Sequence, residues 1–177
     1  MARRHYARFF GLTLALLALA GFVESAYAID LESWDQKITN ASKRFNVLSA
    51  FNNEAVLDKE TGLVWEQSPA TTLHMWDSVG FQCTSRTVGG RKGWRLPSVH
   101  ELASLVDPAN AEPSLPTGHP FTNVQFPDSN YWSATARADD PLRAWDVDFG
   151  FGDVEVDTKT HTLHAWCVRG GMNADQY

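Results

Sequence analysis

The two cysteines of this 177-residue chain are the residues whose possible chemistry is easiest to define. Cys83 and Cys167 are its only cysteines, and they lie far apart in the sequence. Such a pair could form a disulfide, contribute to a metal site or supply a catalytic thiol. The spacing fits no short metal-binding motif, and two cysteines alone would need further ligands. We predict a Cys83–Cys167 disulfide because the first 28 residues predict an export signal, described below, and exported chains reach an oxidising compartment; the metal pair and the catalytic thiol are the alternatives.

A second group of candidates is the carboxylate-rich sequence DVDFGFGDVEVD, residues 146–157. Calcium takes six to eight oxygen ligands, which acidic loops can supply. The spacing departs from an EF-hand loop because Phe151 occupies the position of its glycine. In a hairpin, four carboxylates would line the outer face of the strands: Asp146, Asp148, Glu155 and Asp157. We predict a solvated acidic face, with a weak calcium site as the alternative and no other cofactor.

One short polar segment, residues 86–95, contains the only cluster of basic residues: Arg86, Arg91, Lys92 and Arg95. A sulfated or carboxylated glycan could bind there, with Trp94 stacking on a sugar ring. The interpretation that we favour is a solvated loop with Trp94 buried. No serine lies in a Gly-x-Ser-x-Gly context, and we find no set of nucleophile, base and orienting group.

The first 28 residues predict a secretory signal peptide. Arg3, Arg4 and Arg8 precede an apolar run from Phe9 to Val23, and the small-residue site Ala26-Tyr27-Ala28 follows. The apolar run is shorter than the ~20 residues that a spanning helix needs, so we expect cleavage after Ala28 and no integral membrane span afterwards. The mature chain would be periplasmic or secreted. Residues 29–43 form a predicted helical leader, and residues 171–177 a flexible tail.

The net charge of the mature chain limits the kinds of binding partner that we expect. Removing residues 1–28 takes away three arginines and one glutamate, which shifts the formal net charge from −6 to about −8. Such a surface repels phosphate backbones, so we expect no nucleic acid partner. The oligomeric state is left open by the sequence.

Helices and strands are indicated by periodicity and by end signals. Residues 32–45 and residues 71–83 have helical spacing, the second with a threonine cap and with Cys83 on its inner face. Ser98 and Glu101 form a predicted capping box for a short helix that ends before Pro108. Predicted strands are AVLD, LVWEQ, YWSAT, the hairpin AWDVDF and DVEVD, and a final strand HTLHAWCVRG. Residues 107–130 hold five prolines and predict a long irregular loop.

These pieces, in this order, resemble a known family. LDKETGLVWE, the helix ending at Cys83, GWRLPSVHELASLVD, YWSAT, AWDVDFGFGDVEVD and HAWCVRG are similar to the Lcl C-terminal domain family, a domain of unknown function, over residues 44–170. The resemblance implies a C-type-lectin-like fold shared with formylglycine-generating-enzyme-like domains. That is a single α+β domain with two short helices packed on a small mixed or antiparallel sheet and a long irregular loop region. Families with this fold commonly bridge the first helix to the last strand, where Cys83 and Cys167 lie.

The function expected from these observations is that of an exported, non-enzymatic binding module for a glycan, a polyanion or a cell-envelope partner. The candidate surface is the loop of residues 108–130 together with the basic segment 86–95. One alternative is an enzyme of the formylglycine-generating type, which would need reactive cysteines with copper. The other is a structural or accessory envelope domain with no small ligand.

Overall fold

The computed structural model describes residues 38–126 and 130–170, and every structural statement below concerns these residues. The predicted signal peptide, residues 29–37 of the predicted leader and the predicted tail lie outside them. No helix in the described part of the chain is long and apolar enough to cross a membrane.

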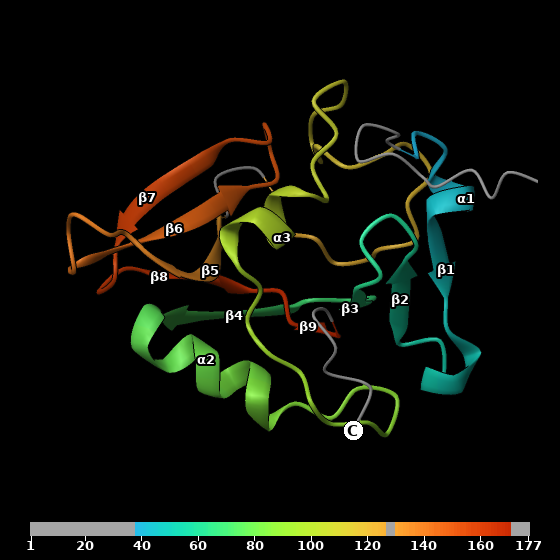
Figure 1. Ribbon diagram of the computed structural model, residues 1–177, viewed down its shortest axis with the longest axis horizontal. Helices are drawn as coiled ribbons and strands as arrows, with labels where there is room; N and C mark the ends of the chain where they lie inside the picture. Colours follow the sequence, from blue (N-terminus) through green and yellow to red (C-terminus); the bar gives the residue numbers. More distant parts are fainter. Residues whose placement is uncertain (1–37, 127–129, 171–177) are drawn as a thin grey trace, which may run out of the picture. The chain divides into compact units, whose positions relative to one another are not determined.

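Short elements alternate along the described chain (Figure 1). They are α1 (Ala41–Arg44), β1 (Phe45–Val47), the 3₁₀ turn η1 (Ser49–Phe51), β2 (Ala55–Asp58), β3 (Val64–Glu66), β4 (Ala70–Met75), α2 (Trp76–Ser85), α3 (Val99–Ala103), β5 (Asn130–Ala136), β6 (Arg143–Asp148), β7 (Val154–Thr158), β8 (Thr162–Ala165) and β9 (Val168–Arg169). One antiparallel sheet has the order β1-β2-β3-β9. The other, β4-β8-β5-β6-β7, is mixed because β5 and β8 run parallel. The predicted α+β class is confirmed, with two sheets in place of one small sheet.

The predicted helix over residues 71–83 is wrong in its first half. Residues 70–75 form strand β4, and α2 begins only at Trp76, so neither threonine caps it. Four of the six β4 residues are exposed, and β8 is the one described strand that pairs with β4, at the edge of its sheet. The buried face of α2 is formed by Val79 and Cys83, which confirms the inward position of the cysteine.

The predicted final strand is divided into two strands that belong to different sheets. β8 pairs with β4 and β5, whereas β9 pairs with β3. Trp166 and Cys167, between them, carry the chain from one sheet to the other, and both are buried. The chain therefore joins the two sheets at the position of its second cysteine.

Local end signals around α3 are confirmed. The Ser98 side chain accepts the Glu101 N–H, and the Glu101 carboxylate accepts the Ser98 N–H, as a capping box requires. The helix has only five residues. Residues 107–126 contain no helix or strand, in agreement with the predicted loop.

The predicted helical leader enters the domain itself. Its described part is helical only in α1, which Asn40 caps, and Phe45 already opens β1. Arg44 is fully buried and donates two hydrogen bonds to Asp58, at 2.9 and 2.7 Å. A third, 2.8 Å long, reaches the carbonyl of Ser104 just after α3. No pattern in the sequence predicted this buried ion pair, which fixes α1 to β2 and to the end of α3.

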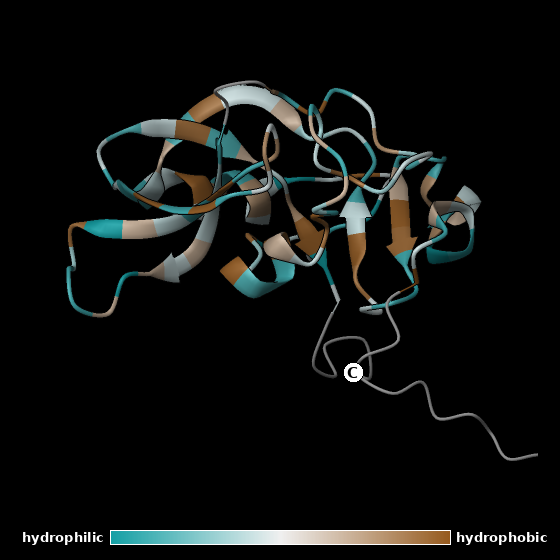
Figure 2. Cartoon of the chain, turned by 90° about the horizontal axis from the view of Figure 1, so that it is seen from above, coloured by the Kyte–Doolittle hydropathy of each residue, from teal (hydrophilic) through white to brown (hydrophobic). Residues whose placement is uncertain are grey.

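Aromatic side chains fill the core between these elements. Trp166 packs edge to face against Trp65 and Phe121, and its indole N–H donates to the Glu66 carbonyl at 2.9 Å. Tyr131 and Phe149 complete the same cluster. Figure 2 shows hydrophobic bands on the strands and mostly hydrophilic or intermediate colours in the connections. The helices and strands of this domain are short, so large aromatic side chains contribute much of the apolar area that is buried in the core.

The predicted disulfide is confirmed. Cys83 on α2 is bonded to Cys167 between β8 and β9, across a sequence separation of 84 residues. Both cysteines are buried, so the bridge ties the only helix of more than five residues in the described chain to the junction of the sheets.

The double variant Cys83→Ala/Cys167→Ala is expected to lose about 4 kcal/mol of unfolding free energy, because the bridge closes a long loop in the unfolded chain. Urea unfolding monitored by tryptophan fluorescence measures this loss. Reduction of the parent protein should produce a similar loss and should leave the double variant unchanged. Equal stability of the oxidised and reduced parent would contradict the structural role of the bridge.

Candidate functional site

The four basic candidates do not form one open patch. Arg86 donates from Nε to Glu66 Oε1 at 2.7 Å, and Arg95 forms two hydrogen bonds with Glu101, at 2.8 and 2.6 Å. Burial raises the pKa of Glu101, but the bonds from Arg95 and Ser98 outweigh burial and lower it. Arg95 also donates a hydrogen bond to the Gly170 carbonyl, so its side chain links the end of β9 to Glu101 on α3. Its role is structural.

The other two basic candidates lie at the exposed end of the segment. The guanidinium of Arg91 packs on the Phe51 ring, at 4.9 Å from the ring centroid, which is within the reach of a cation–π contact. Lys92 is exposed. Trp94 is only 2% exposed, and its indole N–H donates to the Arg91 carbonyl at 2.9 Å. It is therefore a core residue, as we favoured, and offers no stacking surface to a sugar.

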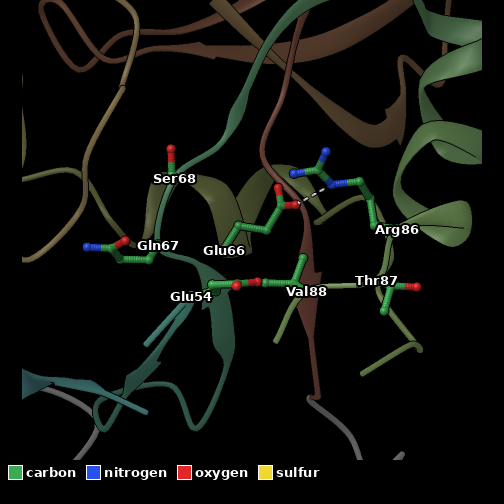
Figure 3. A pocket seen from close by; sticks show the side chains of 7 residues that line it. All are labelled: Glu54, Glu66, Gln67, Ser68, Arg86, Thr87 and Val88. Carbon is green, nitrogen blue, oxygen red and sulfur yellow. Dashed lines mark hydrogen bonds and ion pairs between the residues drawn. The ribbon is translucent and has the colours of Figure 1, made fainter. Parts of the chain in front are cut away.

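Arg86 instead lies in a polar pocket of about 240 Å³ (Figure 3). Three segments build it: the residue before β2, the end of β3 with the two residues after it, and the segment that follows α2. Its lining residues are Glu54, Glu66, Gln67, Ser68, Arg86, Thr87 and Val88. We name this site the polar pocket.

The long loop meets the polar pocket through two of these lining residues. Gln67 donates from its side-chain amide to the Pro120 carbonyl at 3.0 Å, and Ser68 accepts from the Asn123 side chain at 2.8 Å. The predicted binding surface combined the loop after Pro108 with the basic segment 86–95. The structure connects these two segments through Gln67 and Ser68, at the polar pocket.

Glu66 supports the floor of the polar pocket. It is 1% exposed, and burial raises the pKa of its carboxyl despite hydrogen bonds from the Cys167 N–H and from Arg86. The Cys167 N–H donates to Oε2 at 3.0 Å, while Oε1 accepts from Arg86. Alternation along LVWEQ indicates only that Glu66 shares one face of the strand with Val64, so it did not reveal this buried carboxylate. No local signal marks it, because its partners are distant in sequence.

Two groups in the polar pocket keep hydrogen-bonding capacity for a ligand. Within the described chain, Arg86 is bonded only through Nε, so both terminal nitrogens of its guanidinium keep their donors. Figure 3 shows the Arg86 guanidinium beside the Glu66 carboxylate, with the bond from Nε drawn as a dashed line. Glu54 accepts the Gly89 N–H through Oε2 at 2.7 Å, and Oε1 has no bond to a described residue. The pocket therefore offers donors and acceptors together.

A separate apolar groove of about 410 Å³ lies beside α3. It is lined by Val99, His100, Ala103, Thr135, Trp145 and Val154. The groove forms because α3, with five residues, covers only part of the sheet face formed by β5, β6 and β7. No pattern in the sequence indicated this groove, since its lining residues come from four separate elements.

The four acidic candidates do not form the solvated face that was predicted. Asp146 is 0% exposed and Asp148 is 9% exposed, so both are buried, and the prediction is wrong for them. Asp148 accepts the Gly150 N–H at 2.6 Å and shapes the hairpin turn. Glu155 is exposed, while Asp157 is half-buried and bonded to His161.

Asp146 and Glu155 share a donor. The side-chain amide of Asn130 donates to Asp146 Oδ1 at 2.6 Å and to Glu155 Oε2 at 2.9 Å. Asp146 Oδ2 is buried without a partner in the described chain. Burial raises the pKa of Asp146 to about 6, and repulsion from Glu155, Asp157 and Asp148 adds to the increase. In the described residues, no group of three or more histidine, cysteine or acidic side chains has an arrangement that could hold a metal ion.

The variant Asp146→Asn is expected to remove a pH-dependent loss of stability. The carboxyl has a pKa of about 6 when folded and an ordinary value of 3.8, so the folded state loses stability as pH rises from about 4 to about 6. Above pH 6 the cost is fully present, about 2 kcal/mol after allowance for solvent screening. The variant should be more stable at pH 7.5 and similar to the parent below pH 4.

Thermal unfolding from pH 3.5 to 8 measures this difference. Asp153→Asn, an exposed change in the same hairpin, serves as the control and should retain the parent's pH dependence. A parent-like pH profile of Asp146→Asn would contradict the assignment.

The chain is similar to a known protein family. A family model described as the Lcl C-terminal domain matches residues 54–169, which is more than half of the chain. No curated protein matches the sequence. The matched range contains the disulfide, the polar pocket and all four acidic candidates. By this match, the chain belongs to the Lcl C-terminal domain family.

Proposed function

We propose that this protein is an exported, non-enzymatic domain that binds a glycan in the polar pocket. The observation that carries the proposal is the arrangement of Arg86 and Glu54, which present open donors and an open acceptor at one hollow. Sugar hydroxyls both donate and accept, so they match such a mixed lining better than a purely anionic group does. A carboxylate or sulfate on the glycan would fit the two terminal nitrogens of Arg86.

The same geometry argues against an extended polyanion as the ligand. Arg86 and Arg95 are already paired with carboxylates, so their charges are largely compensated. Glu54 adds a negative charge at the pocket, which repels an anionic polymer. Only Arg91 and Lys92 of the basic cluster have no ion pair within the described chain.

The disulfide supports both export and a binding role. A buried bridge is stable in an oxidising compartment, which agrees with the predicted signal peptide. The formylglycine-type alternative would need Cys83 and Cys167 as reactive thiols, and here they are bonded to each other. A structural or accessory envelope domain is the remaining alternative, and an absence of any glycan ligand would favour it.

Export predicts a defined N-terminus. Signal peptidase cleavage after Ala28 would leave Ile29 as the first residue of the protein recovered from the periplasm or the medium. N-terminal sequencing and intact mass under non-reducing conditions test this expectation. An uncleaved chain retained in the cytoplasm would contradict the proposal of export.

Two conservative variants test the polar pocket. Arg86→Lys keeps a positive charge for Glu66 but loses the planar fork, and Glu54→Gln keeps an acceptor for the Gly89 N–H but loses the charge. After a glycan array has identified a ligand, each variant should bind it about tenfold more weakly, the loss of one to two charged hydrogen bonds. Isothermal titration calorimetry with that glycan measures the change.

Lys92→Gln is the matched control, because Lys92 lies in the same exposed segment but outside the pocket lining. It should bind as tightly as the parent protein. The array is run with and without calcium, since a weak calcium site is the alternative that the sequence leaves open. Absence of binding in both conditions, or parent-like binding by both pocket variants, would rule out the proposed site.

A further inference from the structure

Strand β7 is an edge strand with open backbone groups. It pairs with β6 and, among the strands of the described chain, has no second neighbour in the order β4-β8-β5-β6-β7. In Figure 1 it lies at the outer margin of this sheet. The Asp148 N–H donates to the Asp153 carbonyl at 2.9 Å, and the Lys159 N–H donates to the Leu142 carbonyl at the other end. These two bonds fix which residues of β7 face β6.

Hydrogen-bonded pairs alternate with non-bonded pairs along an antiparallel ladder. The register pairs Asp146 with Glu155, Val147 with Val154 and Trp145 with Val156. The bonded pairs are therefore those of Glu155 and Asp157, and the N–H and C=O groups of Val154 and Val156 point away from β6. Outside the β6–β7 ladder, neither valine has a backbone hydrogen bond to another described residue. The next outward N–H, that of Thr158, is bonded to the Asp157 side chain.

The two faces of this edge differ in chemistry. Val154 and Val156 lie on the same face as Trp145, next to the apolar groove. Val154 is 46% exposed, and Phe151, in the turn before the strand, is 60% exposed. Glu155 and Asp157 lie on the opposite face with the buried Asp146. The edge is thus apolar on one side and acidic on the other.

We propose that β7 is a docking strand for an extended peptide in which apolar and basic residues alternate. Its backbone would pair with the open groups of Val154 and Val156 and add a sixth strand to the sheet. Its apolar side chains would enter the groove between α3 and Trp145, and its basic side chains would lie over Glu155 and Asp157. This site is distinct from the polar pocket and does not depend on the proposed glycan function.

Charge complementarity selects this occupant over a second copy of the chain. Pairing of two β7 strands would bring Glu155 and Asp157 of one copy beside the same residues of the other, and like charges in that position repel. A basic partner gains from the same carboxylates. It also reduces the repulsion that acts on Asp146, whose pKa is raised in part by Glu155 and Asp157.

The probe for the test is a synthetic peptide of alternating valine and lysine, with capped ends. Titration into the full mature protein, followed by backbone amide NMR, should shift the Val154 and Val156 amides and protect them from hydrogen exchange. Binding should weaken as salt increases. Three control peptides separate the contributions: glutamate in place of lysine, serine in place of valine, and N-methylated backbone at alternate residues. Each should bind at least about tenfold more weakly.

Two protein variants test the same edge from the other side. Glu155→Lys should weaken binding of the valine–lysine peptide about tenfold, whereas Asp77→Lys, the same charge reversal on exposed α2, should not. Val156→Pro removes one outward N–H, which is tolerated in an edge strand, and should abolish protection of that edge. Circular dichroism and thermal unfolding show whether the proline variant is folded, and Glu155→Lys tests the proposal in either case.

Equal binding of the lysine and glutamate peptides would overturn the proposal, as would parent-like binding by Glu155→Lys. Binding without protection of the Val154 and Val156 amides would exclude strand addition. No binding at all would leave the acidic residues as protection of the edge against aggregation and refute the docking role. A dimer in sedimentation analysis that is lost in Val156→Pro would identify a second copy as the occupant and refute the peptide proposal.

Discussion

The buried carboxylate of Glu66 is the interaction on which the rest of the domain depends. The carboxylate accepts hydrogen bonds from the Cys167 N–H and from the Arg86 side chain, and the backbone carbonyl of Glu66 accepts a hydrogen bond from the Trp166 indole. One residue of β3 therefore fixes the crossing between the sheets, the disulfide and the end of α2. A buried carboxylate is costly to desolvate, and it is tolerated here because both oxygens have donors and one donor is a cation. Removing either donor would leave a buried charge without compensation, which is more damaging than losing the bond alone.

The polar pocket follows from this constraint. The disulfide fixes Cys83 near the end of α2. Arg86 follows Cys83 by three residues, and Glu66 fixes its side chain through a hydrogen bond from Nε. The open nitrogens of Arg86 are consequently held in one position before any ligand arrives. Such preorganisation lowers the entropy lost on binding, so a small site can bind with useful affinity. The same residues thus provide stability to the fold and geometry to the site.

Local signals in the sequence predicted the parts of the fold that depend on local interactions. The capping box of Ser98 and Glu101 and the β6–β7 hairpin are confirmed because neighbouring residues encode them. The helix over 71–75 is wrong because Ala70–Met75 pairs with a strand ninety residues later, and tertiary pairing overrides local spacing. The burial of Glu66 and Asp146 could not be predicted for the same reason, since their partners Arg86 and Asn130 are distant in sequence. The disulfide could be predicted from the sequence because two cysteines in an oxidising compartment have few chemical alternatives to pairing.

The ion pairs of the arginines show how the negative net charge of the chain is distributed in the fold. Arg44, Arg86 and Arg95 each neutralise a carboxylate in or near the core, at Asp58, Glu66 and Glu101. These three arginines therefore do not offset the carboxylates at the surface, which carry much of the excess negative charge. Two of these lie at the surfaces that carry free hydrogen-bonding groups: Glu54 at the polar pocket and Glu155 beside the open edge of β7. A partner for either surface must bring donors or positive charge, which is why hydroxyl-rich and basic ligands suit this domain better than anionic polymers.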